Sequence, residues 1–305
     1  MGRLAARRAV LALAVALLAC EAPPAPPPHP APPPHPAPPA ESDREPMFSV
    51  EDGPMTLAMT RVRAEGWRGR LITVSFAPGE LHVRVVPSES PRALDGIVAG
   101  LVTQPFAAIN GGFYDTDGEA MGLVRAGGAE VHPLTERGGS GIFLMEDGRP
   151  RIVHRDAYVA SDRIGDAVQS IDRVVDGGES LVREDRAARR AARSAVAIDA
   201  RGVLHFVIAF DERAIAEEEG ARIVLDEDSG TTGPTLGELA SLLADAPAEG
   251  GLGAVTALAL DGGFSTSLTV KSALRALRVV AYRATINAIV ASTSAPSAAP
   301  SDTPE

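Results

Sequence analysis

The sequence predicts a single α+β domain with a mainly antiparallel or mixed β-sheet and a few packed helices. Segments typical of β-hairpins outnumber segments typical of helices. Strands and helices also fail to alternate regularly, as they would in a doubly wound fold. Hydrophobic residues make up 45 % of the 305 residues, which is enough for one sizeable core. We expect this domain to span residues 47–291.

Strands joined by short polar turns recur along the predicted domain. Residues 71–76 and 81–86 read as the first two strands, around the turn 77–80. Further strands are expected at 106–109, 141–145, 151–153, 195–198, 203–210, 254–260, 267–270 and 285–290.

Two segments have the periodicity of helices. Ser90 and Pro91 are typical of an N-cap followed by proline at the first helical position, with apolar residues at helical spacing up to Leu101. Pro234 precedes a second segment, in which leucines recur at helical spacing. Residues 183–193 are rich in arginine and alanine; we interpret them as a solvated charged face, with a helix as the alternative.

The first nineteen residues are typical of an export signal. Three arginines precede an apolar run at 10–19 that is too short to span a membrane. The run ends in Leu17-Leu18-Ala19-Cys20, which resembles a bacterial lipoprotein signal and implies acylation of Cys20 after cleavage. A plain secretory signal or an ordinary buried cysteine is the alternative. We expect an exported protein that is anchored to the membrane by lipid and faces the periplasm or the cell exterior.

Composition separates the rest of the chain into a tether, the domain and a tail. Residues 20–46 are proline-rich, which predicts an extended tether, and residues 292–305 are predicted to be disordered. The formal charge is −11, and removal of the signal with its three arginines brings it to about −14. This charge argues against binding to nucleic acid and to anionic lipid, so lipid acylation is the expected membrane contact.

Two similar motifs follow apolar runs, one at Asn110-Gly111-Gly112-Phe113 and one at Asp261-Gly262-Gly263-Phe264. Each places a polar side chain directly before two glycines, which tolerate positive φ and allow a ligand to approach the backbone. The alternative is that both are ordinary hairpin turns, because Asn-Gly and Asp-Gly favour such turns. Their recurrence with the same aromatic residue favours a shared site.

These motifs occur in an order that resembles the phosphodiester glycosidase family over residues 60–291. The matching segments are Asn110 to Tyr114, Gly122-Leu123, Ala167 to Ser170, Arg193 to Asp199, Asp261 to Thr266 with its Ser265, and Arg283 followed by Ala288-Ile289. The resemblance implies hydrolysis of the bond between the anomeric carbon of a sugar and a phosphodiester. It also implies a carbohydrate or sugar-phosphate substrate.

The sequence departs from the family pattern at several positions. Phe264 stands where the family has a small residue, Ile171-Asp172 replaces Gly-Pro, and Ala197 replaces a glycine. These departures add bulk where backbone would approach a ligand. They leave open a protein that binds its ligand without turnover.

The implied reaction needs a carboxylate at the sugar and a cation at the phosphate. We assign the carboxylate to Asp261, and the phosphate contact to Arg193 because a guanidinium binds phosphate in a bidentate manner. Asn110 would bind sugar hydroxyls or the phosphate, although both Asn110 and Asp261 could instead serve their own turns. Expected substrate contacts are Gly111, Gly112, Gly262, Gly263, Ser265, Thr266 and Gln169.

No cofactor is expected. Asp115 and Asp117 resemble half of a calcium loop, so a divalent cation there is an alternative to a solvated turn. The function predicted is a hydrolase of sugar-1-phosphodiesters in the cell envelope. The alternative is a non-catalytic lipoprotein that binds glycans or phosphosugars.

Overall fold

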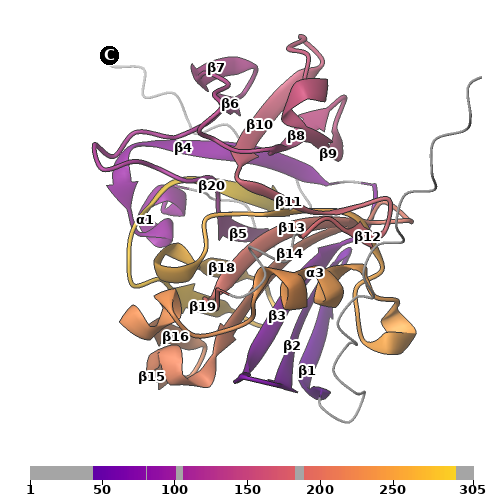
Figure 1. The fold of residues 1–305 in the computed structure, drawn as a ribbon, viewed down its shortest axis with the longest axis vertical. Helices are drawn as coiled ribbons and strands as arrows, with labels where there is room; N and C mark the ends of the chain where they lie inside the picture. The colour runs from indigo at the N-terminus through magenta and orange to yellow at the C-terminus, as the bar shows by residue number, and fades with distance from the viewer. Residues whose placement is uncertain (1–43, 80, 101–105, 183–188, 293–305) are drawn as a thin grey trace, which may run out of the picture. The chain divides into compact units, whose positions relative to one another are not determined.

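The computed structural model describes residues 44–79, 81–100, 106–182 and 189–292, whose strands form three β-sheets (Figure 1). Within these residues strands account for 53 % and helices for 13 %. The α-helices there are α1 (Leu94–Val98) and α3 (Leu236–Ala244). The predicted α+β class with packed helices is therefore wrong, and the domain is β-rich. Residues 1–43, with Cys20, and 293–305 lie outside the described residues.

The largest sheet, sheet A, has eight strands and carries one of the two Gly-Gly motifs just beyond its strand β17. All its neighbouring strands pair antiparallel. Its strand order is β1 (Arg44–Asp52), β2 (Met55–Ala64), β3 (Trp67–Phe76), β14 (Leu204–Asp211), β13 (Arg193–Asp199), β17 (Ala254–Ala259), β11 (Asp172–Asp176) and β12 (Glu179–Ser180).

Two further sheets complete the described part of the chain. Sheet B has the order β15 (Ile215–Glu219), β16 (Arg222–Leu225), β19 (Leu277–Val280), β18 (Leu268–Lys271), β5 (Phe106–Asn110), β20 (Thr285–Ser292) and β4 (His82–Arg92). Sheet C has the order β7 (Ala129–His132), β6 (Val124–Ala126), β10 (Ile164–Ser170), β8 (Gly141–Glu146) and β9 (Arg149–His154). The pair β16–β19 is parallel, whereas the other pairs in these sheets are antiparallel.

The main core lies between sheets A and B and continues into sheet C. Ile72 of β3, Ile109 of β5 and Phe143 of β8 belong to this one buried cluster. The opposite faces are also covered, because α3 packs on the other face of sheet A and α1 on the other face of sheet B. Successive residues of a strand point to opposite faces, so strands covered on both faces have continuous apolar sequences. This explains the unbroken apolar runs that precede the Gly-Gly motifs.

The predicted start of the first helix is wrong. Pro91 lies in β4, and α1 begins at Leu94 after Ala93, whose side chain makes no capping hydrogen bond. Because β4 is the edge strand of sheet B, its prolines do not remove hydrogen bonds from the sheet interior. Leu101, expected on the same helix, lies outside the described residues.

The segments 71–76 and 81–86 are strands, but they do not pair with each other. β3 lies in sheet A and β4 in sheet B, because the chain crosses from one sheet to the other between them. The predicted pairs at 141–153 and 195–210 are confirmed as β8–β9 and β13–β14. The second helix is also confirmed, and Thr235 and Glu238 form a capping box at its start.

Candidate active site

The two Gly-Gly turns lie in direct contact where sheets A and B meet. Asn110 is the last residue of β5, and Asp261 follows the end of β17 by two residues. The Asp261 backbone N–H donates to the Gly111 carbonyl at 3.0 Å. The Asn110 Nδ2 group in turn donates to the Asp261 carbonyl. The sequence motifs therefore come together from different sheets, as the shared-site interpretation requires.

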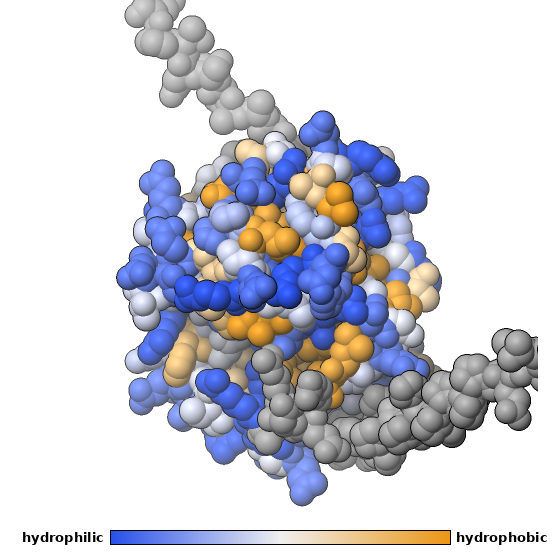
Figure 2. Space-filling view, turned by 45° about the horizontal axis from the view of Figure 1, so that its top comes forward, coloured by the Kyte–Doolittle hydropathy of each residue, from blue (hydrophilic) through white to orange (hydrophobic). Residues whose placement is uncertain are grey.

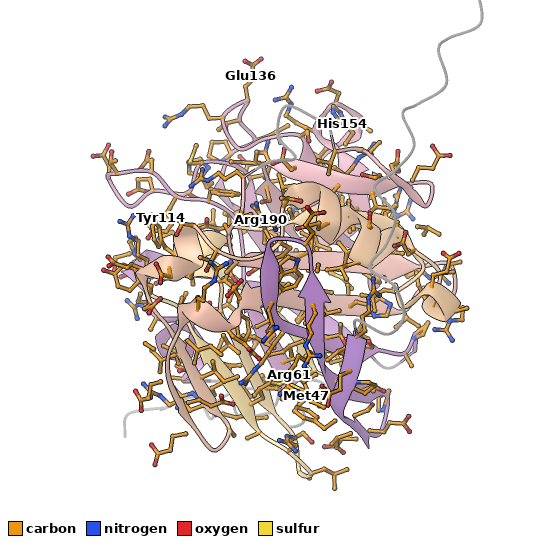
Figure 3. The ribbon with its side chains drawn as sticks, turned by 60° about the horizontal axis from the view of Figure 1, so that its bottom comes forward. Met47, Arg61, Tyr114, Glu136, His154 and Arg190 are labelled. Carbon is orange, nitrogen blue, oxygen red and sulfur yellow. The ribbon has the colours of Figure 1, made fainter. Side chains whose placement is uncertain are left out.

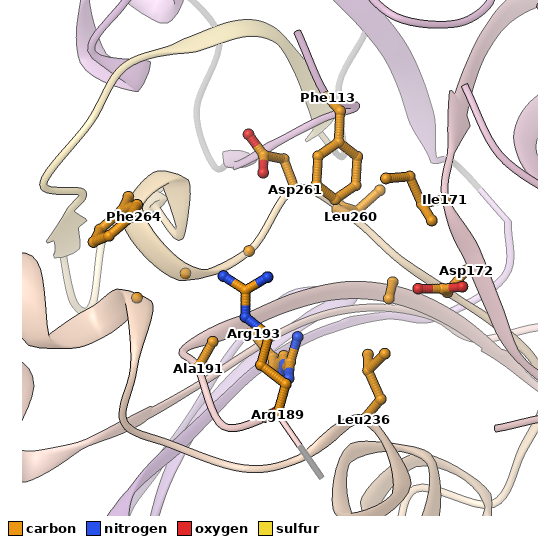
Figure 4. A pocket seen from close by; sticks show the side chains of 14 residues that line it. Phe113, Ile171, Asp172, Arg189, Ala191, Arg193, Leu236, Leu260, Asp261 and Phe264 are labelled. Atoms are coloured by element: carbon orange, nitrogen blue, oxygen red, sulfur yellow. The ribbon is translucent and has the colours of Figure 1, made fainter. Parts of the chain in front are cut away.

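A pocket of about 500 Å³ opens beside Asp261 (Figure 4). Figure 4 shows Phe113 next to Asp261, with Ile171 beyond it, and the side chains of Arg189 and Arg193 facing them. The pocket is lined by Phe113, Ile171, Asp172, Arg189, Ala191, Arg193, Gly230, Leu236, Ala259, Leu260, Asp261, Gly262, Gly263 and Phe264. It thus combines one apolar wall, two cations and two carboxyl groups.

Asp261 is buried, with 8 % of its surface exposed. Burial raises the pKa of its carboxyl from 3.8 to about 7, although the hydrogen bond from the Ser265 side chain opposes this rise. A carboxyl with this pKa exchanges its proton near neutral pH, which suits acid–base or nucleophilic chemistry. Burial and pocket position thus favour the chemical role predicted for Asp261.

Arg193 lines the pocket and is anchored by backbone carbonyl groups. Its Nε donates to the Pro234 carbonyl at 3.1 Å, and its Nη2 donates to the Arg189 carbonyl. Burial and the nearby charge of Arg189 lower the pKa of Arg193, Asp172 and Glu238 oppose this, and the net pKa is about 10. Arg193 therefore remains a cation at neutral pH, held in place by its neighbours and directed to the pocket.

Arg189 provides a second cation in the same pocket. It lies in the run that the sequence suggested to be a solvated face or a helix, of which residues 183–188 lie outside the described residues. Residues 189–192 have no helical structure, and Arg193 begins β13. Arg189 is exposed to solvent, and its side chain lines the open pocket.

Tyr114 and Ser265 surround the Asp261 carboxyl. Burial raises the pKa of the Tyr114 hydroxyl and the Asp261 charge raises it further, whereas Arg283 and a hydrogen bond with Ser265 lower it. The Tyr114 hydroxyl also donates to the Ala284 carbonyl at 3.3 Å. Ser265 thus lies in hydrogen-bonding contact with both Asp261 and Tyr114.

Asn110 is completely buried and does not line the pocket. Its Oδ1 accepts from the Ser194 hydroxyl at 2.8 Å and from the Ser267 backbone N–H at 3.1 Å, while its Nδ2 donates to the Asp261 carbonyl. Both ends of the amide are therefore occupied by protein groups of the two sheets. Asn110 thus fastens the two turns together, and its contact with substrate stays a prediction.

The glycines of the Asn110 turn are needed for close packing of the protein itself. A Cβ on Gly111 would lie 1.8 Å from Asn287 Oδ1, and one on Gly112 would lie 2.5 Å from the Gln169 carbonyl. Asn287 accepts from both turn N–H groups, through its backbone carbonyl from Gly111 and through Oδ1 from Gly112, each at 2.9 Å. Neither glycine lines the pocket.

Gln169 and Thr266 also lie away from the pocket lining. Gln169 Oε1 accepts from the Leu123 N–H at 2.9 Å, and its Nε2 donates to the carbonyls of Thr135 and Gly139 at 2.7 and 2.8 Å. Thr266 is completely buried, and its hydroxyl has no hydrogen-bond partner among the described residues. The expected substrate contacts of these two side chains are therefore not supported by their positions.

Gly262 and Gly263 do line the pocket. A Cβ on Gly262 would lie 2.9 Å from the Ala192 carbonyl, and Gly263 has a φ of +59°. Glycine is favoured at both positions by loop geometry, and both leave backbone open to a ligand. Of the two predicted Gly-Gly pairs, the structure places this pair at the candidate site.

Asp115 closes its own turn. Its Oδ1 accepts from the N–H groups of Asp117 and Glu119 at 3.0 and 3.1 Å. No group of three or more potential metal-ligating residues was found within the described ranges. The arrangement is that of an Asx turn, with Asp117 exposed on it.

Comparison with known proteins agrees with the site geometry. The sequence profile of the phosphodiester glycosidase family matches residues 103–292. The chain belongs to this family. The zebrafish N-acetylglucosamine-1-phosphodiester alpha-N-acetylglucosaminidase catalytic domain, in a form auto-inhibited by its pro-peptide, shares the fold with a TM-score of 0.51 and 14 % identity, covering 81 % of this chain and 82 % of that one.

A hypothetical protein from Synechocystis has a similar fold, with a TM-score of 0.50 and 16 % identity, covering 78 % of this chain but 62 % of its own. No curated protein matches the sequence. At these identities the two structures support the fold, whereas the family profile supports membership of a glycosidase family.

Three of the four residues that depart from the family pattern lie at one place. Phe264, Ile171 and Asp172 all line the pocket beside Asp261. Ala197 instead lies buried in the middle of β13, paired with Ala257 and His205. Three of these four residues therefore line the candidate pocket.

Phe264 is held at the rim by three neighbours. The Arg283 guanidinium lies 4.4 Å from the centre of its ring, and the Tyr282 ring lies 5.8 Å away. A Cβ on Gly230 would approach the Phe264 ring to 2.3 Å, so glycine makes room for it there. Phe264 thus packs against Gly230, Tyr282 and Arg283, and the pocket remains open beside it.

Sequence reasoning gave no role to several residues of this region. Tyr114 follows the first Gly-Gly motif directly, and Arg189 lies four residues before Arg193. Arg283 and Asn287 lie in the last matching segment, and Ser194 adjoins Arg193. Proximity to a motif was the available signal for each, but their contacts depend on which strands lie side by side.

Proposed function

We propose that the chain hydrolyses sugar-1-phosphodiesters in the cell envelope, with Asp261 as the catalytic carboxylate. One observation carries this proposal: the buried Asp261 shares a pocket with Arg189 and Arg193. The arginines would bind the charged phosphodiester, because guanidinium groups pair well with phosphate oxygens. The apolar wall of Phe113 and Ile171 would exclude water from the reacting centre.

In the proposed reaction the bond between the sugar C1 and the phosphate oxygen breaks. The phosphate leaves as a phosphomonoester with the bonding electron pair, and water supplies the hydroxyl group that C1 acquires. Ionised Asp261 would stabilise the oxocarbenium-like centre, attack it, or accept a proton from the water. Each of these roles needs the carboxylate form, so we expect activity to rise as pH increases through about 7.

The test combines a substrate panel with labelled water. The full chain is incubated in ¹⁸O-labelled water with sugar-1-phosphodiesters, with the same sugars as phosphate-free glycosides, and with a phosphodiester that lacks a sugar. We expect cleavage of the first group alone, with the label in the sugar. Label in the phosphate would show attack at phosphorus and would refute the glycosidase reaction. Binding of the panel without any cleavage would favour the non-catalytic alternative.

We also propose that Cys20 is acylated and tethers the domain to a membrane outside the cytoplasm. This proposal rests on the arginine-containing apolar leader and on the lipoprotein-like residues that precede Cys20. No helix in the described ranges is long and apolar enough to cross a membrane. Cys20→Ser is expected to move the protein from the membrane to the soluble fraction. Unchanged fractionation would contradict the anchor.

A further inference from the structure

Arg190 lies in the same short segment as the two arginines of the pocket, but its side chain does not reach the pocket. The pocket is lined by Arg189, Ala191 and Arg193. Arg190 and Ala192, which alternate with them, do not line it. The segment is not helical, and successive side chains of an extended chain point to opposite sides. The Arg190 side chain therefore leaves the segment on the side away from the pocket.

The guanidinium of Arg190 joins three separate parts of the chain. Its Nη1 and Nη2 atoms donate to the two carboxylate oxygens of Glu238 on α3, at 2.9 and 3.2 Å. Nη2 also donates to the Glu65 carbonyl at 2.8 Å, in the turn between β2 and β3, where Figure 3 shows Arg190. Nη1 also donates to the Gly233 carbonyl at 3.1 Å. The planar fork of arginine allows these contacts at the same time, which a lysine ammonium does not reproduce.

The groups that hold Arg190 also hold Arg193. The Arg193 Nε donates at 3.1 Å to the carbonyl of Pro234, which directly follows Gly233. The charge of Glu238 acts on Arg193 as well, because it raises the pKa of the Arg193 guanidinium. The direction of the Arg193 side chain therefore depends on the loop and the carboxylate that Arg190 fastens.

The segment is also packed closely between this loop and the Asp261 turn. A Cβ on Gly233 would lie 2.5 Å from the Ala191 carbonyl, and a Cβ on Gly66 would lie 2.5 Å from the Arg190 guanidinium. The Ala192 carbonyl accepts from the Gly263 N–H at 2.7 Å. Loss of the Arg190 contacts would thus be felt at the wall of the pocket.

Glu238 takes part in the ion pair and in the start of α3. Its Oε2 accepts from the Thr235 N–H at 2.8 Å, and the Thr235 Oγ1 accepts from the Glu238 N–H at 3.1 Å. Glutamine can close the same capping box, so Glu238→Gln removes the charge and leaves the cap. The side chains of Arg190 and Glu238 are 28 and 26 % exposed, and ion pairs near the surface contribute little to stability. The main effect of this pair is therefore on the geometry of the segment that it holds.

We propose that Arg190, paired with Glu238, is a positioning residue that holds Arg189 and Arg193 at the spacing needed to bind a phosphate. Arg190 acts through the backbone of its segment and does not touch the ligand. This proposal rests on the proposed function, because it takes the phosphate of the substrate as the ligand of the two pocket arginines. It adds a residue outside the pocket on which phosphate affinity depends.

The test uses Arg190→Gln, Glu238→Gln and the double variant in the full chain. The matched control is Arg70→Gln, because Arg70 forms a bidentate pair with Glu218 at 2.6 and 2.7 Å. Arg70 lies on β3 two residues before Ile72, so it shares the face of sheet A opposite α3. Titration calorimetry measures the affinity for inorganic phosphate, and cleavage of sugar-1-phosphodiesters gives kcat/KM.

We expect Arg190→Gln and Glu238→Gln each to lower phosphate affinity and kcat/KM about tenfold, since small displacements of binding groups have large effects. The double variant should lose no more than either single variant, because all three remove the same pair. Arg190→Lys should also lose affinity, because it keeps the charge but not the fork. Arg70→Gln is expected to lower the melting temperature and to leave phosphate affinity and kcat/KM unchanged.

Equal phosphate affinity of Arg190→Gln and Arg70→Gln would overturn the positioning role, and so would losses that add in the double variant. Cleavage by the wild-type chain together with either result would leave the proposed reaction standing. No cleavage by the wild-type chain, with a phosphate affinity that depends on the pair, would overturn the reaction and support the positioning role. A wild-type chain that neither cleaves the panel nor binds phosphate would overturn both.

Discussion

The two Gly-Gly turns have similar sequences but different environments. In the Asn110 turn every polar atom of the leading side chain bonds to protein, and the glycines pack against Asn287 and Gln169. In the Asp261 turn the carboxyl is buried beside a pocket, and its two glycines line that pocket. One turn joins the sheets, and the other places a buried carboxyl group beside a pocket where the sheets are joined.

This difference shows why a motif cannot be interpreted from residue type alone. Asn110 donates to the carbonyl of Asp261, so the fastening turn fixes the backbone that carries the carboxyl. The face seen in Figure 2 is mostly hydrophilic, with hydrophobic residues in small separate groups.

The largest expected effect on stability is that of Asn110→Ala. The substitution leaves the Asp261 carbonyl, the Ser194 hydroxyl and the Ser267 N–H without their buried partner. We expect the free energy of unfolding to fall by about 3–5 kcal/mol in urea denaturation. Ser194→Ala, which removes one of these bonds, should cost about 1 kcal/mol. A loss below that value for Asn110→Ala would refute the fastening role.

Asp261→Asn is expected to have the opposite effect on stability. The folded chain retains the Asp261 proton up to about pH 7, whereas the unfolded chain releases it near pH 4, so the wild type loses stability between these values as pH rises. The variant should be more stable than wild type by about 2–4 kcal/mol at pH 8 and nearly equal at pH 3. The same difference at both pH values, in chemical denaturation, would be inconsistent with a buried carboxyl of raised pKa.

Glycine substitutions should distinguish the turns further. Gly112→Ala places a Cβ against the Gln169 carbonyl, which is backbone of another sheet, and should cost about 2–3 kcal/mol. Gly263→Ala meets no atom closer than 3.5 Å but imposes a φ of +59° on alanine, which should cost about 1 kcal/mol. Thermal unfolding of both variants measures the order. A larger loss for Gly263→Ala would reverse our view of which turn is more tightly packed.

Tyr114→Phe is expected to have the smallest effect. The hydroxyl contacts Ser265 and lies near Asp261, but its hydrogen bond to Ala284 is long, at 3.3 Å. We expect a loss of stability below about 1 kcal/mol and less than a tenfold decrease in kcat. A loss of activity as large as that of an Asp261 variant would make Tyr114 part of the reacting group.

The sequence predicted ten of the twenty strands in the described residues, namely those whose apolar runs and turn residues are clear local signals. β8, β9, β13, β14, β17, β18 and β20 follow the expected ranges. It did not predict that β3 and β4 lie in different sheets, because pairing depends on contacts between distant segments. Pro91 was misleading for a related reason: an edge strand tolerates proline as a helix start does.

At the site, the sequence assigned the carboxylate role to Asp261 and the phosphate contact to Arg193, and both residues line the pocket. Asn110 and Gln169 were predicted to contact substrate. A side-chain amide can bind either a ligand or backbone groups, and the residue type alone does not distinguish the two. Their burial against Ser194 and Leu123 could not be seen in the chain order. Arg189 was interpreted as surface charge, since a charged run does not reveal which arginine faces a pocket.

The central claim is that the Asp261 turn carries the chemistry. The most direct measurement is kcat/KM of Asp261→Asn on a sugar-1-phosphodiester, with the folded state confirmed by its melting temperature at pH 8. We expect at least a ~10³-fold loss of kcat/KM in a protein that melts above the wild type. A folded variant with activity within about tenfold of wild type would show that the reaction does not depend on this carboxylate.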